Sequence, residues 1–154
     1  MADLDAMYQQ IILDAARERH GEGLLESHDG DSFQVNPTCG DQVTLQVKLS
    51  ESGDVIERLG WEGQGCSISQ ASISIMTDML EGRTVAEAME LFETFRELMD
   101  SRGQGLTDEI EDQLDDAAAF VGVAKFPMRV KCALLGWMAM RDATDKAVVA
   151  GEAE

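Results

Sequence analysis

The chain has 154 residues, 44% of them hydrophobic, and its 30 acidic and 12 basic side chains give a formal net charge of −18. This length suits one domain with a sizeable core, and the composition favours a folded chain over a disordered one. An acidic surface repels phosphate backbones, so nucleic-acid binding is not expected, and no apolar run reaches the roughly 18 residues of a membrane span. The charge either serves solubility or favours a partner with a basic docking surface.

The residues from Met1 to Met7 are acidic in character, which argues against a secretory signal or a transit peptide. Three cysteines in a chain without an export signal make a disulfide framework a poor interpretation. A metal site or a reactive thiol is the better one. We therefore expect a reducing, cytoplasmic compartment.

Apolar positions predict a first helix over residues 4–19, and a polar, glycine-rich loop follows over 20–32. His20 and His28 belong to this loop and are expected to be solvated rather than to bind a metal. Phe33 and Val35 predict a short edge strand.

Strict alternation of apolar and polar residues over 43–49 is the clearest strand signal in the chain. A turn at 50–54 returns the chain into a second strand over 54–62. In the resulting antiparallel hairpin, the start of the first strand lies beside the end of the second, so Cys39 and Asp41 should fall next to the segment 63–66.

Helical patterns occupy the rest of the chain. One stripe runs from Ile68 to Met79 and ends at Gly82. A capping box at Thr84 opens the next helix, Thr107 opens a third and Pro127 a fourth, with a frayed, disordered tail after residue 148. The order of elements predicts an α+β fold, with a small antiparallel three-stranded sheet packed against about five helices in a single domain over residues 1–154.

The third helix is expected to be continuous across its apolar positions Ile110, Leu114 and Ala118.

The cysteines and one carboxylate form the candidate site. Cys39 and Asp41 are separated by a glycine that lets both side chains point the same way. Cys66 stands at a helix N-terminus, which favours the thiolate, and Cys132 lies about one turn inside the last helix. Three thiolates and a carboxylate make a tetrahedral set suited to zinc, and three thiolates could equally begin an iron–sulfur site.

The cysteines could also have a purely structural role. Free cysteines are often simply part of the core. Lys125, Arg129 and Lys131 surround Cys132 and would offset the negative charge of a metal site. Arg129 shares a helical face with Cys132, and our hypothesis is that it pairs with Asp41 behind the ligands.

Three motifs together resemble the U-type iron–sulfur assembly proteins, and within them the SufU branch: Pro-Thr-Cys-Gly-Asp, Gly-Gln-Gly-Cys-Ser-Ile-Ser and Arg-Val-Lys-Cys-Ala-Leu-Leu-Gly-Trp. The resemblance covers nearly the whole chain. Scaffold members usually have histidine before the third cysteine, where this chain has Lys131. This chain also carries an extra segment around residues 101–123, between the second and third cysteines. Both departures are typical of the SufU branch and weaken the scaffold interpretation, because a fourth cluster ligand is missing.

The resemblance implies a zinc-dependent sulfurtransferase that takes persulfide sulfur from a pyridoxal-phosphate cysteine desulfurase of the SufS type. It would pass this sulfur to the iron–sulfur assembly complex. The implied zinc ligands are Cys39, Asp41, Cys66 and Cys132, with Cys39 as the sulfur acceptor. Cys39 suits release from the metal because Cys66 and Cys132 are anchored to helices. The alternatives are a scaffold that carries an iron–sulfur cluster and a purely structural zinc in an interaction module.

Overall fold

The structure, a computed structural model, describes residues 2–38 and 40–153, with side chains from residue 6 to 38 and from 40 to 151. The elements in chain order are α1 Ala2–Glu18, β1 Gly30–Asn36, β2 Asp41–Leu49, β3 Ile56–Gln64, α2 Ser67–Leu80, α3 Val85–Asp100, α4 Asp108–Gln113, the 3₁₀ helix η1 Asp115–Lys125, and α5 Pro127–Ala153. The fold is α+β, as the sequence predicts.

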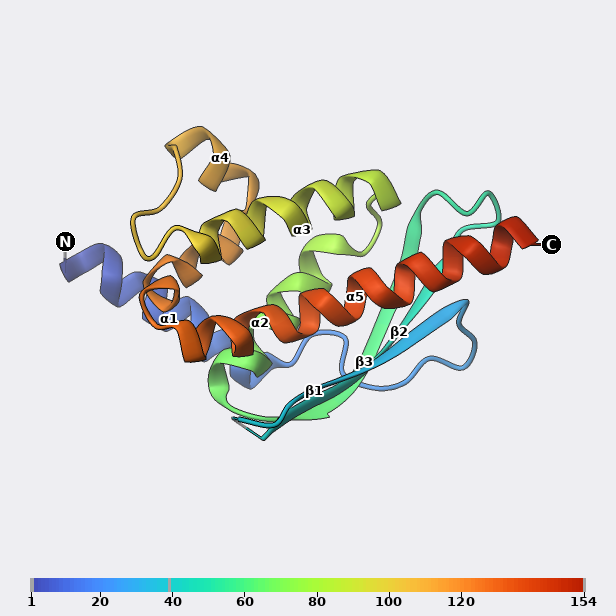
Figure 1. Cartoon of the computed structure of the whole chain (residues 1–154), viewed down its shortest axis with the longest axis horizontal. Coiled ribbons are helices and arrows are strands. Elements are labelled where there is room, and N and C mark those ends of the chain that lie inside the picture. Colours follow the sequence, from blue (N-terminus) through green and yellow to red (C-terminus); the bar gives the residue numbers. More distant parts are fainter. Residues whose placement is uncertain (1, 39, 154) are drawn as a thin grey trace.

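The sheet is antiparallel with strand order β1-β2-β3, and α5 lies across β1 and β2 (Figure 1). The alternating apolar side chains of β2 are all buried: Val43, Leu45, Val47 and Leu49. Because side chains alternate across a strand, this set forms one face of the sheet and meets the helices. The predicted edge strand is confirmed, and it is longer than expected because residues 30–32 pair with β2 as well.

The loop after α1 runs along the free edge of β3. The Gly23 N–H donates to the carbonyl of Trp61 at 2.7 Å, and the Trp61 N–H donates to the carbonyl of Gly21 at 3.2 Å. The indole of Trp61 also donates to the carbonyl of His20 at 2.7 Å. These bonds cover an edge that would otherwise be free to pair with another chain, and they bring the end of α1 close to the hairpin.

Helix α2 is buried on nearly all sides between the sheet, α1 and α5. Its approach to α5 depends on small residues: a Cβ at Gly136 would lie 2.9 Å from Ile73 Cβ. Ser72 Oγ donates to the carbonyl of Ala133 at 2.6 Å, which satisfies a buried hydroxyl across the same contact. This contact sets the start of α2 against the first turns of α5.

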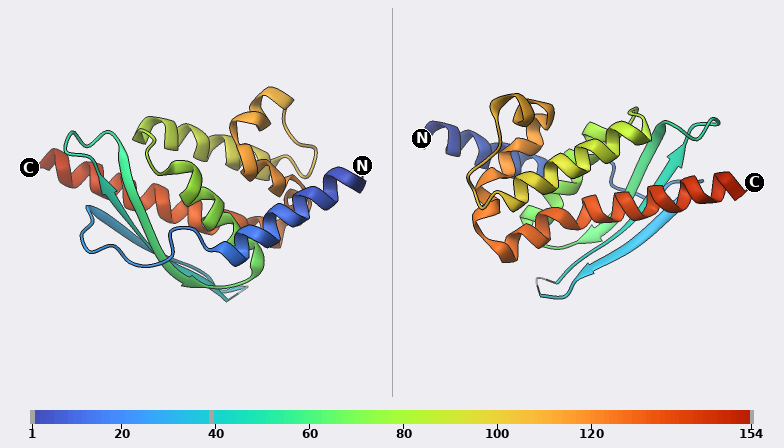
Figure 2. Two further views of the ribbon diagram at one scale, coloured as in Figure 1. Left: turned by 180° about the vertical axis from the view of Figure 1, so that it is seen from behind. Right: turned by 45° about the horizontal axis from the view of Figure 1, so that its top comes forward.

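Helices α3 and α4 with η1 form a layer on the side of α2 and α5 that faces away from the sheet (Figure 2). The capping box at Thr84 is present, as predicted. The core of this layer includes Phe95, whose ring stacks on Trp137 with centroids 4.7 Å apart.

The prediction of one continuous third helix is wrong. Helix α4 ends at Gln113, and Asp115 adopts the left-handed conformation with φ 49°. The turn there redirects the chain into η1, so that both Leu114 and Phe120 become fully buried. Burial of two large apolar side chains outweighs the cost of one strained residue.

Helix α5 continues past residue 148 to Ala153, which differs from the disordered tail that the sequence suggested. Close packing holds the part of α5 just before residue 148: a Cβ at Gly30 would lie 2.1 Å from the carbonyl oxygen of Ala143 and 3.0 Å from Ala147 Cβ. Among the described helices, none is long and apolar enough to cross a membrane.

Candidate metal centre

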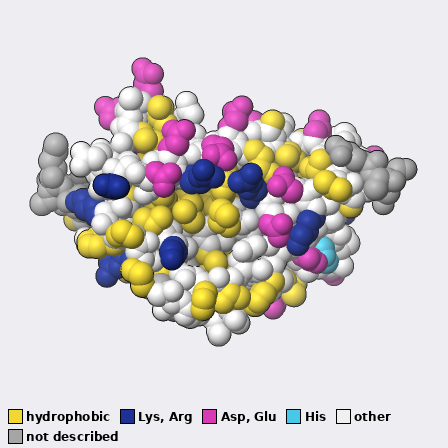
Figure 3. All heavy atoms as spheres, in the orientation of Figure 1, with side chains coloured by type: hydrophobic (Ala, Val, Ile, Leu, Met, Phe, Trp, Pro, Cys, Tyr) yellow, Lys and Arg dark blue, Asp and Glu magenta, His cyan; other side chains and the backbone are white. Residues whose placement is uncertain are grey.

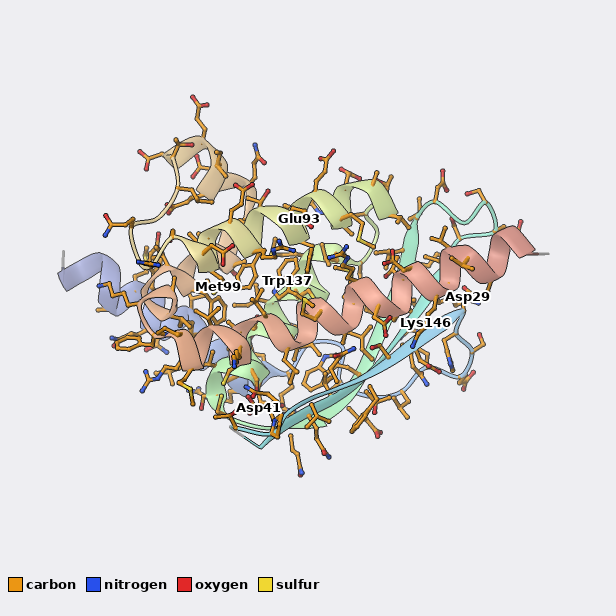
Figure 4. The ribbon with its side chains drawn as sticks, in the orientation of Figure 1. Asp29, Asp41, Glu93, Met99, Trp137 and Lys146 are labelled. Carbon is orange, nitrogen blue, oxygen red and sulfur yellow. The ribbon has the colours of Figure 1, made fainter. Side chains whose placement is uncertain are left out.

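Asp41 is the carboxylate at the centre of the candidate site. It opens β2, is 0% exposed, and lies opposite Asn36 of β1. Figure 4 shows it at the end of the sheet, near the start of α2 and the first turns of α5. Its Oδ1 accepts the backbone N–H of Cys66 at 2.8 Å. A fully buried carboxylate is costly unless hydrogen bonds or a cation compensate for its lost hydration.

Cys66 occupies the N-cap position of α2, and no side chain caps that helix. Its Sγ lies 3.9 Å from Asp41 Oδ2 and 3.9 Å from Ser69 Oγ. The first turn of a helix carries backbone N–H groups without intrahelical acceptors, and the Cys66 side chain stands beside them. The structure therefore brings Asp41 beside Cys66, as the hairpin argument predicts.

Cys132 lies in the second turn of α5 and is 2% exposed. Its thiol lies 3.7 Å from the carbonyl oxygen of Met128, one turn earlier. The side-chain amide of Asn36, at the end of β1, donates to Cys132 Sγ at 3.8 Å. The third sulfur thus reaches the site from α5, as predicted.

One ligand atom from each of Asp41, Cys66 and Cys132 lies within 4.8 Å of the other two. Ligands of a tetrahedral zinc, bound at about 2.3 Å for sulfur and about 2.0–2.2 Å for oxygen, stand roughly 3.5–3.8 Å apart. The separations within 4.8 Å therefore need to shorten by no more than about 1.3 Å to hold such an ion. Two sulfurs and a buried carboxylate oxygen are also donors that zinc accepts. The residues fit a zinc ion with one coordination position left for a further ligand.

The expected fourth ligand, Cys39, lies outside the described residues. Its neighbour Gly40 has φ +72°, a conformation that glycine adopts without strain, and nothing lies within 4 Å of where its Cβ would be. The assignment of Cys39 as ligand and sulfur acceptor therefore stays a prediction.

Arg19, which the sequence did not single out, joins the end of β3 to the first turn of α2, on either side of Cys66. The Arg19 guanidinium donates to the carbonyl of Gly63 at 3.3 Å and to the side chain of Gln70, and it stands 4.8 Å from the ring centroid of Trp61. An ion pair at 2.6 Å and a side-chain hydrogen bond hold the same group against Glu22. That hydrogen bond from Arg19 holds the pKa of Glu22 below its ordinary value.

Arg129 is exposed, and its guanidinium lies 5.1 Å from the ring centroid of Phe126. No ion pair among the described residues joins it to Asp41, so that pairing stays a hypothesis. Lys125 and Lys131 are exposed on the same stretch of chain. In Figure 3, Lys and Arg side chains and hydrophobic side chains share the end at which α5 begins, whereas acidic side chains gather over α3 and α4.

The two histidines lie away from the cluster, as expected. Both are exposed; His20 pairs with Glu18 at 2.8 Å and His28 with Asp31 at 3.0 Å.

Comparison with known proteins places this architecture in a family. The sequence pattern of the NifU-like N-terminal domain matches residues 7–133. The chain belongs to the NifU-like N-terminal domain family. A curated member, the zinc-dependent sulfurtransferase SufU of Bacillus subtilis, is 40% identical over 148 residues, which cover 94% of each chain.

Two further relatives bear on the site. The iron–sulfur cluster assembly scaffold protein IscU of Streptococcus pyogenes is 37% identical over 143 residues, or 93% of this chain and 86% of that one. The crystal structure of a putative iron–sulfur cluster assembly scaffold protein for the SUF system of Fervidobacterium islandicum superposes with a TM-score of 0.75 at 34% identity, covering 87% of this chain and 93% of that one. This NifU-like domain therefore has relatives named both for sulfur transfer and for cluster assembly.

Proposed function

We propose that this NifU-like protein is a zinc-dependent sulfurtransferase, which accepts persulfide sulfur from a cysteine desulfurase of the SufS type and passes it to iron–sulfur cluster assembly. The convergence of Asp41, Cys66 and Cys132 within 4.8 Å carries the proposal. The relative of 40% identity that is named a zinc-dependent sulfurtransferase supports it. Thiolates persist in a reducing compartment, so we place this activity in the cytoplasm.

A bound zinc ion would keep its sulfur ligands deprotonated at neutral pH. Asp41, Cys66 and Cys132 would hold that ion, and Cys39 would complete the set. Because Cys66 is fixed at the start of α2 and Cys132 is buried in α5, we assign the reactive role to Cys39.

Sulfur transfer itself requires no oxidant. The thiolate of Cys39 attacks the outer sulfur of the desulfurase persulfide, and a new sulfur–sulfur bond forms on Cys39. The bond between the two donor sulfurs breaks, and the donor cysteine leaves as a thiolate. The transferred sulfur keeps its proton, so atoms and charge balance.

Such a transfer needs the two proteins in contact, and an apolar groove beside the site offers a docking surface. The groove lies among α1, the start of α2, η1 and the start of α5, and its lining includes Ser67, next to Cys66, and Arg129, one turn before Cys132. Leu13 and Phe126 line it while remaining 51% exposed each. We propose that this groove receives a segment of the desulfurase.

The charge of the groove specifies that segment further. Lys125 and Arg129 line it, and no Asp or Glu is among its described lining residues, although the chain carries 30 acidic side chains. The matching segment has apolar side chains flanked by at least one carboxylate, because opposite charges steer and orient the encounter.

A scaffold for an iron–sulfur cluster is the second candidate, favoured by the relative named IscU at 37% identity. The two candidates differ in what the protein carries. A zinc protein is colourless, whereas a cluster scaffold is brown and releases sulfide in acid.

Metal analysis of anaerobically purified protein tests the proposal, with zinc, iron and labile sulfide measured on wild type and Cys39→Ser. One zinc per chain without iron is expected. The wild-type protein is then incubated with cysteine and its desulfurase, and mass spectrometry is expected to find one added sulfur on Cys39. Iron with sulfide would favour the scaffold, and persulfide on Cys66 or Cys132 but never on Cys39 would refute the assignment of the acceptor.

A further inference from the structure

Asn36 has a buried side chain that the sulfur-transfer chemistry described above does not use. It is the last residue of β1, is 6% exposed, and pairs with Asp41 across the strands. Asparagine is disfavoured in strands, and a buried amide costs free energy unless it is hydrogen-bonded. A buried asparagine at this position therefore needs a partner, and its Nδ2 lies 3.8 Å from Cys132 Sγ.

The direction of this hydrogen bond is fixed once Cys132 is a thiolate. A thiolate can only accept hydrogen bonds, so the amide must present its N–H to the sulfur. Ser69 beside Cys66 is arranged differently, because its hydroxyl donates to the carbonyl of Cys66 at 3.0 Å. Cys132 thus receives a side-chain N–H from the strand that leads into the Cys39 loop.

We propose that Asn36 is a positioning residue that holds the Cys132 sulfur as a metal ligand and lowers its nucleophilicity, so that incoming sulfur is not captured at Cys132. The inference deepens the proposed function and rests on it. A hydrogen bond to a metal-bound ligand orients that ligand and draws electron density from it. A thiolate depleted in this way attacks an electrophile more slowly.

The same contact links Cys132 to the hairpin formed by β1 and β2. Asn36 and Asp41 close the base of the segment that contains Cys39, and the amide of Asn36 ties this base to α5. The bond therefore fixes the hairpin mouth against Cys132 even while Cys39 is engaged with a sulfur donor.

The test uses cobalt(II) in place of zinc and needs no desulfurase. The thiolate-to-cobalt charge-transfer band is recorded for wild type, Asn36→Ala and Asn36→Asp. Gln34→Ala is the matched control, because Gln34 lies on the same side of the same strand and its amide donates to Ser32 at 2.9 Å instead. Both Asn36 variants are expected to shift the band to lower energy, because a sulfur without the N–H donor releases charge more easily; the control is expected to leave it unchanged.

A second readout follows the sulfur directly. Zinc-loaded proteins are treated with iodoacetamide, and the alkylation rate of each cysteine is measured by mass spectrometry. Loss of one hydrogen bond of about 1 kcal/mol should speed alkylation of Cys132 about fivefold in both Asn36 variants. An unshifted charge-transfer band together with an unchanged alkylation rate of Cys132 would overturn the proposal. A band shift and a faster alkylation in Asn36→Ala that are both absent in Asn36→Asp would overturn it as well, because they would report lost packing.

The outcomes separate this proposal from the function on which it rests. A wild-type protein that binds neither cobalt nor zinc would refute the metal site and the role of Asn36 together. A wild-type protein that binds metal but accepts no sulfur from its desulfurase would refute the sulfurtransferase, and the band and alkylation rates would still decide whether Asn36 tunes Cys132.

Discussion

The substitution Gly65→Ala tests the metal centre without removing a ligand. A Cβ at this position would lie 2.2 Å from Asp41 Oδ1 and 2.7 Å from Ser69 Oγ. Asp41 is 0% exposed, so its carboxylate cannot turn out into solvent without a change in the surrounding structure. Either the carboxylate or the loop must therefore move, and the hydrogen bond of 2.8 Å between the Cys66 N–H and Oδ1 is lost.

The size of the effect follows from that bond. A hydrogen bond to a charged group contributes about 1.5–3 kcal/mol, so zinc affinity should fall roughly 10- to 150-fold. The measurement is competition for zinc against a chromophoric chelator at neutral pH. Gly122→Ala is the matched control, because nothing lies within 4 Å of its Cβ position, and it should bind zinc as the wild type does.

Zinc affinity of Gly65→Ala within twofold of wild type would show that Asp41 is not held as argued. Far-UV circular dichroism of the metal-free variants separates this case from unfolding. If Gly65→Ala has lost its secondary structure while Gly122→Ala has not, the loop supports the fold rather than the metal alone.

Cys132→Ser should abolish stoichiometric zinc binding and lower the thermal midpoint of the zinc-loaded preparation, both measured beside wild type. An unchanged zinc content would show that Cys132 is a buried core residue and not a zinc ligand. Burial and the neighbouring carboxylates raise the pKa of Asp116, so its stabilising contribution is present at low pH and lost as the pH rises through the folded-state pKa. Asp116→Asn should therefore raise the thermal midpoint at neutral pH, and this gain should shrink as the pH falls through the folded-state pKa; a gain that is equal at every pH would refute the cause. Leu13→Asp should weaken desulfurase binding at least tenfold with zinc content unchanged. The control Val149→Asp, at a residue of α5 that is 62% exposed, should leave desulfurase binding unchanged. A changed oligomeric state in Leu13→Asp alone would indicate that a second copy of the chain occupies the groove.

Local sequence patterns predicted most elements because each has a short-range cause. The alternation over 43–49 fixes which face of β2 is buried, and the capping box at Thr84 starts α3 where predicted. The third helix failed because its end is decided by tertiary burial. The apolar positions Leu114 and Phe120 cannot both reach the core along a straight helix, and the left-handed turn at Asp115 has no strong sequence signal.

The candidate site likewise combines contacts that the sequence predicts with contacts that it does not. Antiparallel pairing brings Asp41 beside Cys66, so hairpin geometry alone predicts their proximity. The contributions of Asn36 and Arg19 could not be inferred, because each reaches the site through a contact between elements distant in sequence. The sequence shows only that an asparagine follows the predicted edge strand, and its burial appears only in the structure.

The geometry also explains why a carboxylate stands among sulfur ligands. Asp41 has two oxygens: Oδ1 accepts the Cys66 N–H, while Oδ2 lies 3.9 Å from Cys66 Sγ. One carboxylate can therefore hold the loop of a neighbouring ligand with one oxygen and bind a metal with the other. A thiolate has a single sulfur and would have to give up one of these roles. In the proposed mechanism, a centre built in this way would keep Asp41 and Cys66 together while a fourth ligand leaves to accept sulfur.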